Sequence, residues 1–153
     1  MASKSDDILI LETSQGAVKI ALKPKLAPKH VARIKELVRS KFYDGLVFHR
    51  VIDGFMAQTG CPQGTGTGGS GQKLSAEFTP TKHGRGTCSM ARAASPDSAD
   101  SQFFICFADA PWLNNQYTVW GEVIEGMENV DKIKRGEPVK GPDKIVTAKI
   151  AAD

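Results

Sequence analysis

The sequence predicts a mainly β fold, either a closed antiparallel barrel or a sandwich, with helices at its periphery. Three observations favour this class: about eight short apolar runs have strand character, only two segments have helical spacing, and strands do not alternate with helices as in a parallel sheet. The 153 residues, 41% of them hydrophobic, suit one domain, and no repeat or linker divides them.

The N-terminal part of the chain predicts a hairpin followed by a helix. The apolar runs 8–11 and 17–22 are separated by Thr-Ser-Gln-Gly, which is typical of a hairpin connection, although the register stays open. After Pro28, which suits a first helical turn, apolar residues recur at helical spacing until residues 40–45 end the helix. Its outer face is basic. We interpret that face as solvated, because the apolar stripe is narrow and lacks an aromatic anchor for a membrane.

The remainder of the chain predicts strands joined by long connections rich in Gly, Ser and Pro. The expected strands span residues 47–52, 55–58, 87–92, 102–107, 117–124 and 145–150, and a short helix spans residues 127–134. The connection 62–86 is long for a structureless loop, so we expect it to contribute to a functional site.

Charge and hydropathy exclude several classes of protein. Lys and Arg number 20 against 17 Asp and Glu, and the resulting charge of +3 is too small to indicate nucleic-acid binding by itself. No apolar stretch approaches the roughly 20 residues that cross a bilayer, and residues 1–7 lack the apolar core of a secretion signal. We therefore expect no nucleic-acid partner, no membrane association and a cytoplasmic location.

The cysteines indicate neither a disulfide framework nor a metal site. Cys61, Cys88 and Cys106 are odd in number, lie far apart and include no C-x-x-C pair. We expect reduced, mostly buried thiols and no bound metal. A Cys–His nucleophile formed with one of the three histidines is the alternative, but no local motif marks it.

The sequence GTGTGG at residues 64–69 satisfies the G-x-G-x-x-G pattern of a dinucleotide site. Such a loop must open a helix within a βαβ unit, whereas the following SGQKLS has no helical periodicity. The G-K-[ST] of a P-loop is also absent from the segment. We interpret it as a surface loop or groove wall and expect no cofactor, with a nucleotide-dependent enzyme as the alternative.

A more specific constellation is FHRVIDGFMAQ at residues 48–58, followed by SMA at 89–91, SQFFI at 101–105 and PWL at 111–113. In order and spacing these motifs resemble the cyclophilin family of peptidyl-prolyl isomerases, and the resemblance covers about residues 7–151. It implies a cyclophilin-like domain over residues 7–151, a closed eight-stranded antiparallel β-barrel capped by two α-helices. Residues 1–6 are expected to form a flexible N-terminus.

The residues of these motifs can form an apolar socket with a polar rim. Gln102 and Phe104 alternate onto one face of a strand, while Phe103 and Ile105 face the other way. Phe55 is one residue out of phase with Met56 and Gln58, so Gly54 or a bulge near it would have to redirect the backbone to bring all three together. The rings of Phe55 and Phe104, together with Met56 and Leu113, can form an apolar socket that suits a proline ring.

Arg50 is the candidate electrostatic catalyst. Rotation about an X-Pro bond breaks no bond and transfers no proton, so a donor that bonds the prolyl nitrogen as it pyramidalises stabilises the transition state selectively. Arg50 is always charged and presents a rigid fork of N–H groups. The alternative is that Arg50 merely pairs with a nearby carboxylate such as Asp53. His49 is expected to be structural, since no general base is needed.

The resemblance implies a set of site residues. Arg50, Phe55 and Gln58 are the expected catalytic residues, and the expected substrate-binding residues are Met56, Gly66, Ala91, Arg92, Ala93, Gln102, Phe104, Trp112, Leu113 and Tyr117. Arg92 and Tyr117 stand where the commonest eukaryotic pattern has Asn and His, which resembles the bacterial branch and puts peptide preference in question. Trp112 resembles the tryptophan with which family members hold cyclosporin.

The implied protein is a cofactor-free monomeric isomerase that acts on proline-containing peptides and unfolded proteins and so assists folding. Cyclosporin is a further expected ligand. An alternative from another class is a proline-peptide binding or chaperone-like module that has lost catalysis while keeping the fold.

Overall fold

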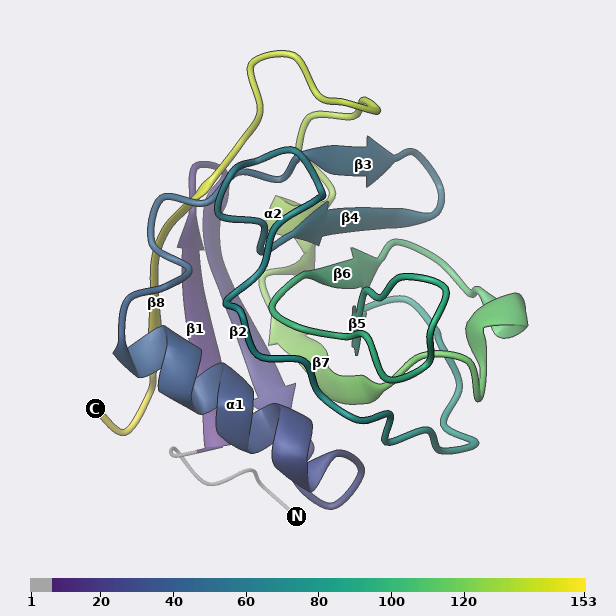
Figure 1. The fold of residues 1–153 in the computed structure, drawn as a ribbon. Coiled ribbons are helices and arrows are strands. Elements are labelled where there is room, and N and C mark those ends of the chain that lie inside the picture. Colours follow the sequence, from purple (N-terminus) through teal and green to yellow (C-terminus); the bar gives the residue numbers. More distant parts are fainter. Residues whose placement is uncertain (1–6) are drawn as a thin grey trace.

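The apolar runs of the sequence form one antiparallel sheet. The computed structural model describes residues 7–153, which contain eight strands and two α-helices (Figure 1). The strands are β1 (Ile8–Thr13), β2 (Gly16–Leu22), β3 (Arg50–Ile52), β4 (Met56–Thr59), β5 (Thr87–Met90), β6 (Phe103–Cys106), β7 (Val119–Glu125) and β8 (Ile145–Ile150). The helices are α1 (Pro28–Arg39), the 3-10 helix η2 (Pro111–Leu113) and α2 (Met127–Val130). The mainly β class is confirmed.

The expected hairpin and first helix are both present. β1 and β2 pair in a register that places Thr13 opposite Gly16, so two residues form the turn. Helix α1 begins with Pro28, and its apolar stripe, including Val31 and Ile34, is buried in the core. In Figure 1 the helix lies across the end of the sheet formed by β1, β2 and β8. Neither α-helix of residues 7–153 has the length and apolar character to cross a membrane.

The second expected helix is shorter than the sequence indicates. Helix α2 covers four residues, although the chain continues in hydrogen-bonded turns to Ile133. The amide of Asp131 still donates to Met127, but those of Lys132 and Ile133 donate to carbonyls only three residues earlier. The helical path therefore tightens into turns beyond the first α-helical turn.

The expectation of a closed barrel is wrong: the sheet is an open, curled half-barrel in which β3 and β8 are the two edges. Near the opening, Val47 and Lys144, which precede these strands, form only an isolated bridge. The outer edge of β3 is instead occupied by Gly136, which exchanges two 2.8 Å backbone hydrogen bonds with Val51. The sheet stays open because β3 has only three residues and the connection before β8 covers its free edge.

Side chains on the two faces of the sheet form two separate apolar clusters. In β6, Phe103 and Ile105 are buried in the main core, where Phe103 meets the edge of the Trp120 ring at 5.1 Å. Phe104 and Cys106 belong to a smaller cluster on the opposite face. This confirms the alternation predicted for residues 102–107 and places the smaller cluster beneath the candidate site.

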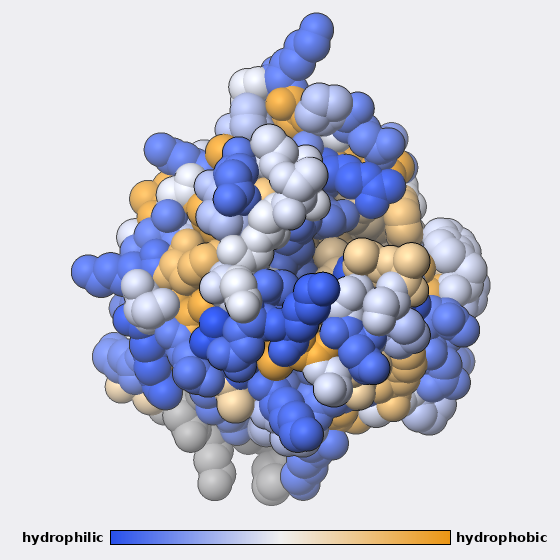
Figure 2. All heavy atoms as spheres, viewed as in Figure 1, coloured by the Kyte–Doolittle hydropathy of each residue, from blue (hydrophilic) through white to orange (hydrophobic). Residues whose placement is uncertain are grey.

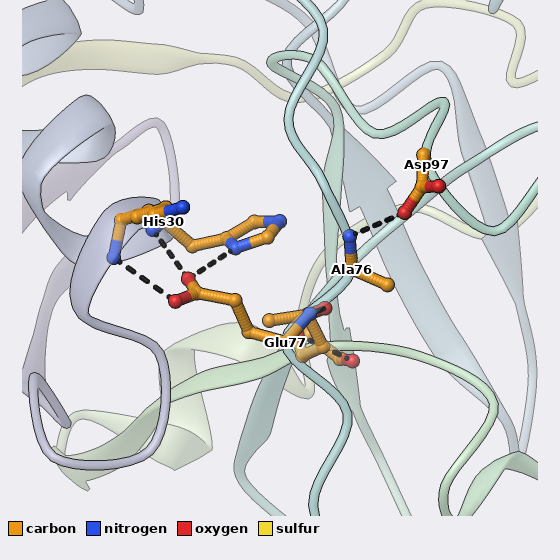
Figure 3. A network of polar contacts seen from close by, with 7 residues as sticks. His30, Ala76, Glu77 and Asp97 are labelled. Atoms are coloured by element: carbon orange, nitrogen blue, oxygen red, sulfur yellow. Dashed lines mark hydrogen bonds and ion pairs between the residues drawn. The ribbon is translucent and has the colours of Figure 1, made fainter.

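The long connection 62–86 is tied to helix α1 by Glu77 (Figure 3). The helix has no side-chain cap of its own, and the Glu77 carboxylate instead accepts hydrogen bonds from the backbone N–H groups of Lys29 and His30, at 3.2 and 2.8 Å. The buried ring of His30 lies with Nδ1 2.6 Å from the same carboxylate. Glu77 therefore caps the helix from a distant part of the sequence and complements its dipole.

We predict that Glu77→Gln lowers the free energy of unfolding by about 1–3 kcal/mol at neutral pH, because a largely buried charged acceptor is lost. Burial raises the pKa of the Glu77 carboxyl, but the hydrogen bonds from His30 and Lys29 outweigh it and hold that pKa below its usual 4.5. Because the carboxyl pKa is lower in the folded than in the unfolded state, the ionised carboxylate stabilises the fold at pH values above the unfolded-state pKa. This contribution is lost as the pH falls through the folded-state pKa.

Urea unfolding between pH 3 and 7 measures this effect. The difference in the free energy of unfolding between the wild type and Glu77→Gln should narrow as the pH falls below about 4.5. The exposed Glu36, which pairs with Arg33 at 3.7 Å, provides the control: Glu36→Gln should change stability by less than about 0.5 kcal/mol. Equal effects of the two substitutions would contradict the capping role of Glu77.

Candidate active site

An apolar cavity of about 300 Å³ opens above the smaller cluster. Its walls come from β3, β4, β6, η2 and the segments after β5 and before β7. Every residue that lines it is among those expected from the sequence: Arg50, Phe55, Met56, Gln58, Ala91, Arg92, Phe104, Trp112, Leu113 and Tyr117. The aromatic and aliphatic walls suit a proline ring, and the volume leaves room for neighbouring parts of a peptide.

Phe55 joins this cavity through a turn. Gly54 has φ of +72°, a left-handed conformation that favours glycine, and the N–H of Phe55 donates to the carbonyl of Ile52. Phe55 therefore precedes β4 and escapes the strand alternation that would have turned it away from Met56. Its ring packs 5.6 Å from that of Trp112. The expected redirection at Gly54 is thus present.

The Phe104 ring is supported by neighbouring rings. His83 stacks on it at 6.3 Å, and Tyr117 meets it edge-on at 5.7 Å. The buried His83 ring is held by Ser89 Oγ, 2.9 Å from Nε2, and Asn114 Oδ1, 3.1 Å from Nδ1. Burial lowers the pKa of His83. Sequence reasoning missed this support, because His83 lies in an irregular connection without periodicity.

A chain of hydrogen-bonded side chains lines the rim of the cavity. Arg50 and Gln58 are directly opposed on β3 and β4, and Arg50 Nη1 donates to Gln58 Oε1 at 3.3 Å. Gln58 Nε2 donates to Gln102 Oε1 at 3.0 Å, and Gln102 Nε2 donates to the carbonyls of Gly66 and Gly68, each at 2.9 Å. Each amide accepts a hydrogen bond from the preceding residue of the chain and donates one to the next, so its orientation is determined by its neighbours.

Arg50 makes an ion pair, although not with the carboxylate considered first. Its Nε donates to Glu137 Oε2 at 3.1 Å, whereas Asp53 pairs with Arg135, also at 3.1 Å. The Arg50 side chain remains 42% exposed, so the guanidinium borders both the cavity and solvent. Neither His49 nor any other histidine lines the cavity.

His49 lies beneath this rim. It is buried, and neither ring nitrogen has a hydrogen-bond partner among the described residues. Burial and the neighbouring charge of Arg50 lower the pKa of His49. The neutral ring therefore acts as packing.

A second cavity of about 310 Å³, lined by fewer large apolar side chains, adjoins the first and shares Gln58, Ala91 and Arg92 with it. It contains the remaining expected residues, Gly66, Ala93 and Gln102. Its other lining residues are Thr67, Gly68, Gly69, Lys73, Ser98 and Asp100. The first four lie in the connection 62–86, which was expected to contribute to a site, whereas Ser98 and Asp100 were missed by sequence reasoning. The glycine run forms a groove wall and opens no helix, as the sequence interpretation expected.

Arg92 braces the boundary between the two cavities. Its Nε donates to the Gln116 carbonyl and its Nη1 to that of Ala93, each at 2.9 Å. The guanidinium also lies 4.7 Å from the centre of the Tyr117 ring, in cation–π geometry. The two departures from the commoner pattern, Arg92 and Tyr117, are therefore packed on each other.

The glycine wall is also held by Cys61. The N–H groups of Gly66 and Gly68 each donate to its sulfur at 3.3 Å. Cys61, Cys88 and Cys106 are all buried and unpaired, as expected. Among residues 7–153, no group of three or more His, Cys, Asp or Glu side chains could hold a metal ion.

Comparisons with known proteins agree with this geometry. The family model described as cyclophilin type peptidyl-prolyl cis-trans isomerase matches residues 8–151. A Brucella suis protein named "Probable peptidyl-prolyl cis-trans isomerase" is 51% identical over 99% of this chain and 86% of its own length. The chain belongs to the cyclophilin-type peptidyl-prolyl cis-trans isomerase family.

Solved structures agree in fold. A cyclophilin from Hirschia baltica superposes with a TM-score of 0.92 at 29% identity, over 100% of this chain and 77% of that one. A Cryptosporidium parvum cyclophilin-type isomerase, crystallised in the presence of the dipeptide Ala-Pro, gives 0.88 at 30% identity, over 95% of this chain and 99% of that one.

The hydrogen bonds to Cys61 predict an unusual thiol. Burial raises its pKa, but hydrogen bonds from the backbone N–H groups of Gly68, Thr65, Gly66 and Gln63 outweigh burial and lower it to about 7. Burial raises the pKa of Cys106 to about 12, and that of Cys88 well above its usual value. We expect thiolate absorbance at 240 nm to rise with a midpoint near pH 7, and Cys61→Ser to remove that step. Cys106→Ser, the control, should leave it unchanged; a folded protein without titration below pH 9 would contradict the assignment.

Proposed function

We propose that this isomerase accelerates rotation about X-Pro bonds in unfolded or flexible protein segments, with Arg50 as the electrostatic catalyst. The observation that supports the proposal is the position of the Arg50 guanidinium at the rim of the apolar cavity. The other guanidinium at this cavity, that of Arg92, already donates to the carbonyls of Gln116 and Ala93. The chain of Gln58 and Gln102 beside it holds the rim in one hydrogen-bonding arrangement.

The mechanism follows from the origin of the barrier. Amide resonance imposes about 18–20 kcal/mol on rotation. When the bond twists, the prolyl nitrogen becomes pyramidal and can accept a hydrogen bond that the planar ground state cannot. A donor such as Arg50 therefore lowers the barrier selectively, and a gain of about 5–7 kcal/mol corresponds to roughly 10⁴–10⁵ in rate.

The apolar cavity would strengthen this contact. Phe55, Met56, Phe104 and Leu113 are the groups proposed to surround the proline ring, which would displace water near Arg50 and raise the local strength of the hydrogen bond. Residues before the proline would lie along the second cavity, where amide and backbone groups can bind a peptide chain. The Ala-Pro dipeptide used with the Cryptosporidium parvum relative is consistent with proline-containing peptides as substrates.

We predict that Arg50→Ala lowers the catalysed exchange rate by roughly 100-fold or more, the usual cost of removing one preorganised donor. Exchange spectroscopy by NMR on a short X-Pro peptide, with catalytic amounts of protein, measures the rate directly. Arg39→Ala is the control, because Arg39 is similarly exposed and pairs with Asp153 away from the cavity. Unchanged turnover in Arg50→Ala would contradict the mechanism, and a folded wild type without activity would indicate a proline-binding module.

We also propose cyclosporin as a ligand of the apolar cavity. Trp112 is 64% exposed at its rim, and its indole N–H can donate to a carbonyl of the ligand. Trp112→Ala should weaken cyclosporin binding by roughly 30-fold or more, measured by calorimetry. The exposed Ile124 lies outside the cavity, so Ile124→Ala should bind as the wild type does. Equal affinity in the Trp112 variant would contradict the proposal.

The remaining proposals concern the state of the protein. We propose a monomeric, cytoplasmic protein that assists folding, with residues 7–151 as its functional domain; the flexibility expected of residues 1–6 concerns a segment outside the described residues. On the face in Figure 2, hydrophobic residues form small patches among hydrophilic ones, which supports the monomer, and the unpaired cysteines suit a reducing compartment. A dimer in sedimentation velocity, or a secreted fraction, would contradict these two proposals.

A further inference from the structure

The connection between α2 and β8 brings an acidic residue to the candidate catalyst. Gly136 in this connection pairs with Val51 of β3 through two backbone hydrogen bonds of 2.8 Å. The neighbouring Glu137 therefore lies along the free edge of β3, beside Arg50. In Figure 1 this connection passes over the outer edge of the short strand.

Glu137 and Gln58 hold the guanidinium of Arg50 at two different nitrogens. Nε donates to Glu137 Oε2 at 3.1 Å, and Nη1 donates to Gln58 Oε1 at 3.3 Å. A guanidinium is planar, so two contacts at different nitrogens restrict the orientation of that plane as well as its position. The contacts leave Nη2 free of side-chain partners among the described residues and available to a substrate.

The ion pair is too exposed to matter much for folding. The side chains of Arg50 and Glu137 are 42% and 57% exposed, and such pairs contribute little to the free energy of unfolding. Catalysis is more sensitive to position, because a donor stabilises the transition state only when it is held in the reacting geometry. A long, flexible arginine loses rotational freedom when it is held, and a partner that orders it in advance removes that cost from the reaction.

We propose that Glu137 is a positioning residue, which orients Arg50 for its contact with the twisted prolyl amide. This inference rests on the proposed role of Arg50. Glu137 touches no substrate in this account, since it does not line the apolar cavity. Its effect should therefore fall on the rate of the bound complex and not on peptide affinity.

Exchange rates at saturating X-Pro peptide and peptide dissociation constants, both from NMR, test the proposal. Glu137→Ala should lower the saturated exchange rate by roughly threefold to tenfold and leave the dissociation constant within twofold. Glu137→Gln should recover part of the loss, because its amide oxygen can still accept from Arg50 Nε. A saturated exchange rate of Glu137→Ala equal to or above that of the wild type would overturn the proposal.

Asp53→Ala is the matched control for Glu137→Ala. Asp53 pairs with Arg135, which directly precedes Gly136 in the same connection, through an ion pair of the same 3.1 Å length. Its loss would loosen the connection without removing a partner of Arg50. The exchange rate of Asp53→Ala should stay within twofold of the wild type, and a loss equal to that of Glu137→Ala would assign the effect to the connection and overturn the proposal.

A double substitution separates the failure of this inference from that of the proposed function. If Glu137 acts through Arg50, Glu137→Ala should have no further effect in an Arg50→Ala background. Equal losses in both backgrounds, with Arg50→Ala itself impaired, would overturn the positioning role alone. Full activity of Arg50→Ala would overturn both proposals. Thermal unfolding of each variant confirms that the comparisons concern folded protein.

Discussion

The alternation of side chains along β6 is the constraint on which both the core and the site depend. Phe103 and Ile105 fill the main core, while Phe104, between them, forms the floor of the apolar cavity. A shift of one residue in the pairing of β4 with β6 would exchange these faces and remove the site together with the core. The floor of the cavity is therefore part of the sheet, and this fixed position suits a catalyst that must be preorganised.

Hydrogen bonds from polar side chains fix the positions of the loops, as backbone pairing fixes the positions of the strands. Glu77 links the long connection to the first turn of α1, and the same residue donates its N–H to Thr118, next to Tyr117 of the cavity. Cys61 accepts hydrogen bonds from the N–H groups of Gly66 and Gly68 in the glycine wall, and Gln102 donates to the carbonyls of the same two residues. Irregular segments thus acquire defined positions around the substrate cavity without regular secondary structure.

Much of the fold and the site could be predicted because the relevant signals are local. Helical spacing after Pro28 and alternation around Phe104 each depend on neighbours in sequence. The motif at residues 48–58 is likewise one continuous segment, and its resemblance to the cyclophilin family can be seen without knowledge of the fold. The contact between Arg50 and Glu137, which are 87 residues apart, has no such signal, because it arises from the pairing of Gly136 with β3. The open sheet edge escaped prediction for the same reason: whether two edges meet depends on strand lengths and connections far apart in the chain.

The most direct test of the account is a crystal structure of the protein with an X-Pro peptide bound. The account predicts that the proline ring lies among Phe55, Met56, Phe104 and Leu113. A free N–H of Arg50 should be directed toward the prolyl amide, and Glu137 should still accept the hydrogen bond from Arg50 Nε. A peptide bound with its proline outside this cavity, or with Arg50 turned away from the prolyl amide, would contradict the account.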